Sequence, residues 1–87
     1  MEFDYRTRGT CSSSIHVALD GRRVKRVAFT GGCNGNLQGI SRLVIGMKAE
    51  DAIRRMQGIR CGGKASSCPD QLSIALTRAL EKEEKAQ

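Results

Sequence analysis

The sequence predicts an α+β domain in which an antiparallel β-meander of about three strands is followed by three helices packed on one face. Polar and apolar residues alternate through the first third of the chain, whereas apolar residues recur at helical spacing in the remainder. Asp20-Gly21 is a strong hairpin signal between two alternating segments. The 87 residues suffice for one domain, residues 1–87, in which 81–87 form a frayed, solvated tail.

The three expected strands cover residues 3–7, 11–19 and 24–30. In the first, aromatic residues and threonine alternate with charged residues, which is typical of a short, exposed strand. In the second, the alternation places Cys11 on the same face as the apolar residue Ile15. The register of the third strand stays open, because its apolar residues occupy both phases of the alternation.

Three amphipathic helices are expected after the third strand. The first follows "GGCNGN", with Asn34 or Asn36 as N-cap, and ends near Gly46; its apolar stripe comprises Leu37, Ile40, Leu43, Val44 and Met47. The second begins near Ala49, and Gly58 suits the position after its last turn. The third begins at "SSCPD", where Ser67 and Asp70 form a capping pattern and Cys68 is the first helical residue.

The charge balance permits an anionic partner, because fifteen Lys and Arg outnumber nine Asp and Glu for a formal net charge of +6. Nucleic acid is disfavoured, since a nucleic-acid surface combines basic residues with stacking aromatics and this chain has only Phe3, Tyr5 and Phe29. A basic cluster surrounds the predicted hairpin turn and comprises Arg22, Arg23, Lys25 and Arg26.

We expect a cytoplasmic protein without membrane contact. The first residues contain no apolar signal region, and no segment approaches the roughly 18 apolar residues of a membrane span. In a reducing compartment, cysteines are thiols, metal ligands or redox groups rather than permanent disulfides.

The candidate metal ligands are four cysteines near the ends of predicted elements, Cys11, Cys33, Cys61 and Cys68. Two of them, Cys33 and Cys68, precede or open a helix, where the helix dipole favours the thiolate that binds metals. The other reading is that they are small buried apolar residues, since none of them forms the close pair of about two to four residues usual in zinc sites. His16 is expected on the opposite face of its strand, and Asp70 is explained by capping.

Three segments together resemble the TSCPD-domain family: "GTCSSSI", "GGCNGNLQGISRLVIGM" and "GIRCGGKASSCPDQLSIAL". The motif that names the family stands here as residues 66–70, with serine in place of threonine, which preserves a hydroxyl group. The resemblance runs from about Tyr5 to Leu80 and includes all four cysteine motifs.

The resemblance implies that Cys11, Cys33, Cys61 and Cys68 bind zinc or an iron–sulfur cluster. The family includes small stand-alone bacterial proteins and resembles the C-terminal extension of adenosylcobalamin-dependent ribonucleotide reductases, which implies a link to deoxynucleotide synthesis. A chain of 87 residues cannot hold the reductase machinery, so we expect an accessory module rather than a complete enzyme. A looser similarity, in the placing of Cys11, Cys33 and Cys68, is to U-type iron–sulfur scaffold proteins.

The hypothesis is therefore a metal-binding accessory module whose partner is a reductase or another protein. One alternative is a thiol-redox module in which Cys61 and Cys68 exchange electrons with a partner. Another is a regulatory domain that binds a nucleotide or a protein through the basic hairpin.

Overall fold

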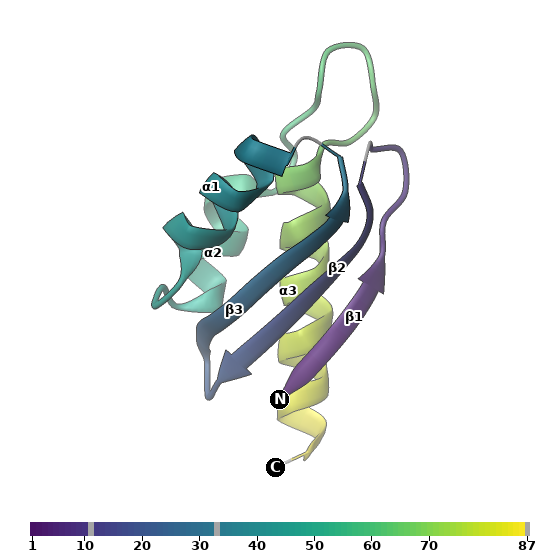
Figure 1. Ribbon diagram of the computed structural model, residues 1–87. Helices are drawn as coiled ribbons and strands as arrows, with labels where there is room; N and C mark the ends of the chain where they lie inside the picture. Colours follow the sequence, from purple (N-terminus) through teal and green to yellow (C-terminus); the bar gives the residue numbers. More distant parts are fainter. Residues whose placement is uncertain (11, 33, 87) are drawn as a thin grey trace.

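The computed structural model describes residues 1–10, 12–32 and 34–86 and has the predicted α+β order of elements (Figure 1). The strands are β1 (Glu2–Arg6), β2 (Ser12–Asp20) and β3 (Arg23–Gly31); the helices are α1 (Asn34–Val44), α2 (Ala49–Met56) and α3 (Cys68–Ala86). The strands form one antiparallel sheet in the order β1-β2-β3. Both the meander and the three helices that follow it are as predicted.

The hairpin between β2 and β3 is confirmed, but its turn lies one residue later than predicted. Asp20 pairs with Arg23, so the two turn residues are Gly21 and Arg22. Gly21 has a φ of 62°, and no other type of residue in the described chain has a positive φ. The turn therefore depends on glycine at its first position, as in a type II′ hairpin, rather than on two left-handed residues.

A β-bulge resolves the register of β3 that the sequence left open. Ala18 pairs with Arg26, whereas the next residue of β2, Leu19, pairs with Val24. Lys25 is thus an extra residue on β3, and it reverses the phase of the alternation. As a result Val24 and Val27, three positions apart, are both buried in the core.

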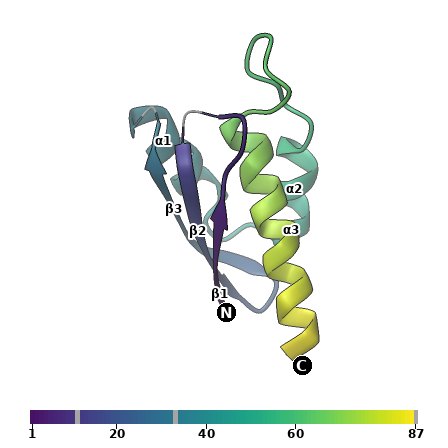
Figure 2. The same cartoon turned by 90° about the vertical axis from the view of Figure 1, so that its right-hand side faces the viewer.

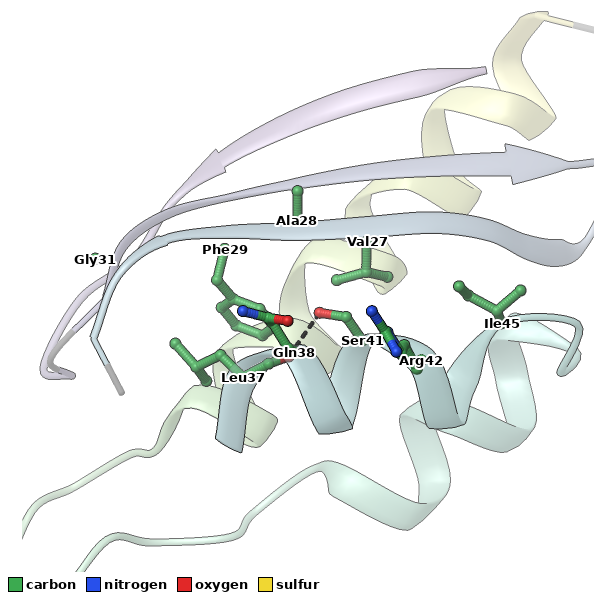
Figure 3. Close-up of a pocket in the computed structure, with 9 residues that line it drawn as sticks. All are labelled: Val27, Ala28, Phe29, Gly31, Leu37, Gln38, Ser41, Arg42 and Ile45. Carbon is green, nitrogen blue, oxygen red and sulfur yellow. Dashed lines mark hydrogen bonds between the residues drawn. The ribbon is translucent and has the colours of Figure 1, made fainter. Parts of the chain in front are cut away.

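The helices cover one face of the sheet. α3 crosses behind β1 and β2, and α2 packs on α3 rather than directly on the strands (Figures 1 and 2). α1 lies beneath β3, and the side chains of Val27 and Phe29 on β3 point toward this helix (Figure 3). The core between these layers includes fully buried residues from the sheet and from α3, chiefly Ile15, Val17, Leu72 and Leu76.

The predicted helix boundaries agree with the structure, but the predicted buried face of α1 is too wide. Gly58 has a φ of 83° and follows the last residues of α2, as predicted. Leu43 was expected on the buried stripe of α1 but is 79% exposed, whereas Val44 and Ile40 carry the contact of this helix with the core. α3 continues through residues 81–86, most of whose described side chains are exposed. No described helix is long and apolar enough to span a bilayer.

Candidate cysteine site at the start of helix α3

Cys68 is the first residue of α3 and is buried, as the "SSCPD" segment predicts. The Ser67 hydroxyl caps the helix by accepting a hydrogen bond of 3.2 Å from the Asp70 N–H. The Cys68 sulfur lies 3.4 Å from the hydroxyl oxygen of Ser12, the first residue of β2. The start of the central strand and the start of the last helix therefore meet at this thiol.

Cys61 lies in the exposed loop that projects between α2 and α3 (Figure 1). Its N–H donates to the Ser66 carbonyl at 3.2 Å, and its carbonyl accepts from the Lys64 N–H at 3.1 Å. These two bonds fold residues 61–66 back on themselves, so Cys61 is held near the end of the loop that leads into α3.

Asp70 closes the base of this loop, a role that its capping position did not reveal. Its carboxylate accepts from the Gly58 N–H at 2.6 Å and from the Ser66 hydroxyl at 2.5 Å. Ser67 adds a third link, because its hydroxyl donates to the Ile59 carbonyl at 2.6 Å. The Ser67 half of the capping pattern is thus formed, whereas the Asp70 side chain joins the two ends of the Cys61 loop.

Gln71 extends this network to the sheet and was missed by the sequence analysis. Its side-chain Nε2 donates to the Ser66 hydroxyl at 2.9 Å, and its side-chain Oε1 accepts from the backbone N–H of Arg8 at 2.8 Å. The available signal was its position at helical spacing with Ala75 and Ala79, on a buried stripe where a polar residue needs partners. Ser12 gave no such signal, since its partner is distant in sequence.

Two of the four predicted ligands, Cys61 and Cys68, line one largely apolar hollow, whose other walls are Ser67, Pro69 and residues of α1 between Gly35 and Leu43. Cys11 and Cys33 lie outside the described residues. Within the described residues, no three His, Cys, Asp or Glu side chains form a group that could hold a metal ion.

His16 lies on the open face of the sheet, opposite to the face of the buried Ile15, as the alternation of β2 predicts. Its Nδ1 is 2.7 Å from the Asp4 carboxylate and its Nε2 is 2.8 Å from that of Glu2. These hydrogen bonds, that of Asp4 first, raise the pKa of His16, and the bond from His16 lowers the pKa of Glu2. Both ring nitrogens are engaged, so this histidine is a surface clamp between β1 and β2.

The basic residues of the hairpin contact other parts of the chain. Arg22 forms ion pairs with Glu50 at 2.7 Å and Glu84 at 3.3 Å, which raise its pKa. Arg23 donates to the Gly46 carbonyl at 2.7 Å. Both side chains therefore tie the hairpin to α2, α3 and the segment that follows α1.

A second hollow lies between β3 and α1 but has different chemistry (Figure 3). α1 contributes Gln38, Ser41 and Arg42, and the Ser41 hydroxyl donates to the Leu37 carbonyl at 2.7 Å. Among the described residues that line it, none is a cysteine, a histidine or a carboxylate.

The chain is thus a small α+β domain in which a hydroxyl-capped helix begins with a buried cysteine, and a second cysteine lies on the loop that leads into that helix. The TSCPD domain family matches residues 3–80, so the chain belongs to the TSCPD-domain family. No significant match was found among curated proteins or solved structures. The resemblance inferred from the three sequence segments is confirmed.

Proposed function

We propose that this chain is a cysteine-cluster accessory module that binds zinc or an iron–sulfur cluster through Cys11, Cys33, Cys61 and Cys68. The observation that carries the proposal is that Cys61 and Cys68, from separate elements, line one hollow. Neighbours of the other two cysteines lie at the same place. Ser12, which follows Cys11 in the sequence, contacts Cys68, and the helix that follows Cys33 forms the wall of the hollow.

The chemistry of the hollow supports thiolate ligands. Cys68 lies at the N-terminus of a 19-residue helix, whose dipole favours negative charge there. A Cys₄ zinc site would carry a net charge of −2, which the net positive charge of the chain would partly offset. Asp70 and Ser67 hold the ends of the loop that carries Cys61, which reduces the conformational entropy lost when that thiol binds.

We further propose that the module acts in the cytoplasm, in association with ribonucleotide reduction and with a reductase or another protein as partner. The support is the resemblance to the C-terminal extension of adenosylcobalamin-dependent ribonucleotide reductases.

The test is the metal content of the protein purified without oxygen, chelator or metal-affinity tag, with zinc and iron both supplied during expression. We expect near-stoichiometric zinc or iron per chain. Each of Cys11→Ser, Cys33→Ser, Cys61→Ser and Cys68→Ser should lower it, whereas Ser13→Ala, an exposed change beside the predicted site, should not. Unchanged metal content in all four cysteine variants, or empty wild-type protein, would contradict the proposal.

A thiol-redox module is the second candidate, and the pairing of an exposed and a buried cysteine in one hollow favours it. In this role Cys61 attacks a partner disulfide and Cys68 resolves the mixed disulfide. The chain then holds a Cys61–Cys68 disulfide, and the partner leaves with two thiols, having gained two electrons and two protons.

Thiol counting under mild oxidation distinguishes the two functions. A redox module should lose two thiols reversibly without any metal, and peptide mapping should assign them to Cys61 and Cys68. Oxidation at other cysteines, or only after metal is removed, would argue against the redox role and for the metal site.

A further inference from the structure

Figure 2 shows β1 beside α3, at the edge of the sheet away from β3. Two hollows that share Phe3 and Arg78 lie between these two elements, and together they are called the basic groove. Its walls include Phe3 and Tyr5 from β1, two carboxylates, Asp4 and Glu81, and five exposed basic residues: Arg6, Arg8, Arg78, Lys82 and Lys85. In the described part of the chain, none of these five pairs with a carboxylate. The five basic residues outnumber the two carboxylates, so the groove presents net positive charge.

Two of these cations are held in place by aromatic rings. The Arg78 guanidinium carbon lies 5.4 Å from the centroid of the Tyr5 ring, and the Lys82 ammonium lies 4.9 Å from that of Phe3. Both distances fall within the range of cation–π attraction. The rings thus fix the positions of the cations, and the cations cover ring faces that could otherwise stack on a ligand.

Backbone N–H and C=O groups on the outer edge of β1 border the groove and point away from β2. The Thr7 N–H donates to the Ser13 carbonyl, and the Leu19 N–H donates to the Met1 carbonyl. These two bonds show which residues of β1 direct their backbone groups toward β2. Successive residues of a strand direct their N–H and C=O groups to opposite sides, so the backbone groups of Glu2, Asp4 and Arg6 point away from β2. No further strand lies beside β1 in the described residues.

We propose that this groove binds an extended acidic peptide that adds to β1 as a fourth strand. Alternate side chains of the peptide would face α3, and carboxylates at those positions would pair with Arg78, Lys82 and Lys85. The spacing agrees: same-face residues of a strand are about 6.7 Å apart, and four residues of a helix rise about 6 Å. Strand addition gives affinity through the backbone, and the basic residues select for acidic side chains.

The groove suits a peptide better than a nucleic acid. Single-stranded nucleic acid gains much of its affinity from bases that stack on aromatic rings. Here the rings of Phe3 and Tyr5 face α3 and are covered by Lys82 and Arg78. A nucleic acid also has no use for the outward backbone groups of β1, whereas a peptide strand pairs with them. This inference is independent of the proposed cysteine site.

The test uses fluorescence anisotropy with a labelled peptide of alternating glutamate and threonine. We expect the double variant Arg78→Gln/Lys82→Gln to weaken binding about tenfold, and Lys25→Gln/Arg54→Gln, which removes the same charge from other exposed positions, less than about twofold. Arg6→Gln/Arg8→Gln provides a second groove variant in case the first unfolds, and it should weaken binding in the same direction.

Backbone pairing is tested by methylating the amides of either the glutamates or the threonines in the probe. A fourth strand directs only one set toward β1, so one methylated probe should lose binding and the other should keep it. Equal binding of both probes would overturn strand addition, and equal weakening by the control and groove variants would overturn the site. Tighter binding of a labelled single-stranded oligothymidylate, lost in the groove variants, would overturn the peptide in favour of nucleic acid.

Discussion

The Ser12 hydroxyl oxygen lies 3.4 Å from the Cys68 sulfur and joins the first residue of β2 to the first residue of α3. Both side chains are buried, and the Ser12 oxygen is also 3.2 Å from the Thr10 hydroxyl. The loop that connects β1 to β2 is thereby fixed against the start of the helix that carries the candidate site.

Replacing Ser12 with alanine should lower the free energy of unfolding by about 1 kcal/mol, because buried hydroxyl partners are lost without replacement. Ser13→Ala is the matched control, since the neighbouring hydroxyl is exposed and donates to the Thr30 carbonyl at 3.1 Å at the surface. Urea unfolding measures both. Equal losses in the two variants would show that the Ser12–Cys68 contact adds no stability.

Removing the Asp70 carboxylate should release both ends of the Cys61 loop. Asp70→Ala should cost about 1–2 kcal/mol of unfolding free energy, because the Gly58 N–H and the Ser66 hydroxyl lose their acceptor. Hydrogen exchange should also become faster in residues 58–67 than in α2. Glu81→Ala, an exposed change on the same helix, should alter stability by less than about 0.5 kcal/mol. Unchanged exchange in the loop would contradict the role assigned to Asp70.

The clamp between β1 and β2 should make stability depend on pH. Because hydrogen bonds to Asp4 and then Glu2 raise the pKa of His16, its contribution is full below its unfolded pKa of about 6.5 and is lost as pH rises through the folded value. Glu2 has a lowered pKa, chiefly through its hydrogen bond with His16, so its contribution is lost as pH falls through the lowered value. The clamp therefore stabilises most in mildly acidic solution.

Unfolding free energies of wild type and His16→Gln across this range measure the effect. The difference between the two proteins should be larger near about pH 6 than near about pH 8.5. The comparison cancels the titration of groups that do not interact with His16. A difference that is constant with pH would mean that the ion pairs of His16 contribute nothing.

The sequence predicted the parts of the site that depend on local spacing. The Ser67 cap and the position of Cys68 follow from a capping pattern whose two residues stand three positions apart in the sequence. Contacts between distant segments could not be predicted in this way. Ser12 with Cys68 and Arg8 with Gln71 each join residues more than fifty positions apart, and no periodicity specifies such a pair.

One feature of the fold that the sequence left open and one that it predicted wrongly have similar physical causes. The Lys25 bulge changes the phase of β3, and alternation within one strand cannot show where its partner leaves a residue unpaired. Leu43 was assigned to a buried stripe because helical periodicity gives the centre of an apolar face but not its width. The width depends on how closely the neighbouring elements approach α1.

Two leucines test this distinction directly. Leu76 is fully buried on α3, whereas Leu43 on α1 is 79% exposed, although both occupy the apolar phase of an amphipathic helix. Leu76→Ala should lower the unfolding free energy by about 2–5 kcal/mol, through lost burial and the cavity that remains. Leu43→Ala should change it by less than about 0.5 kcal/mol. Urea midpoints compare the variants, provided that the slopes agree. A large loss for Leu43→Ala would mean that this side chain is covered in solution, which sequence periodicity alone had predicted.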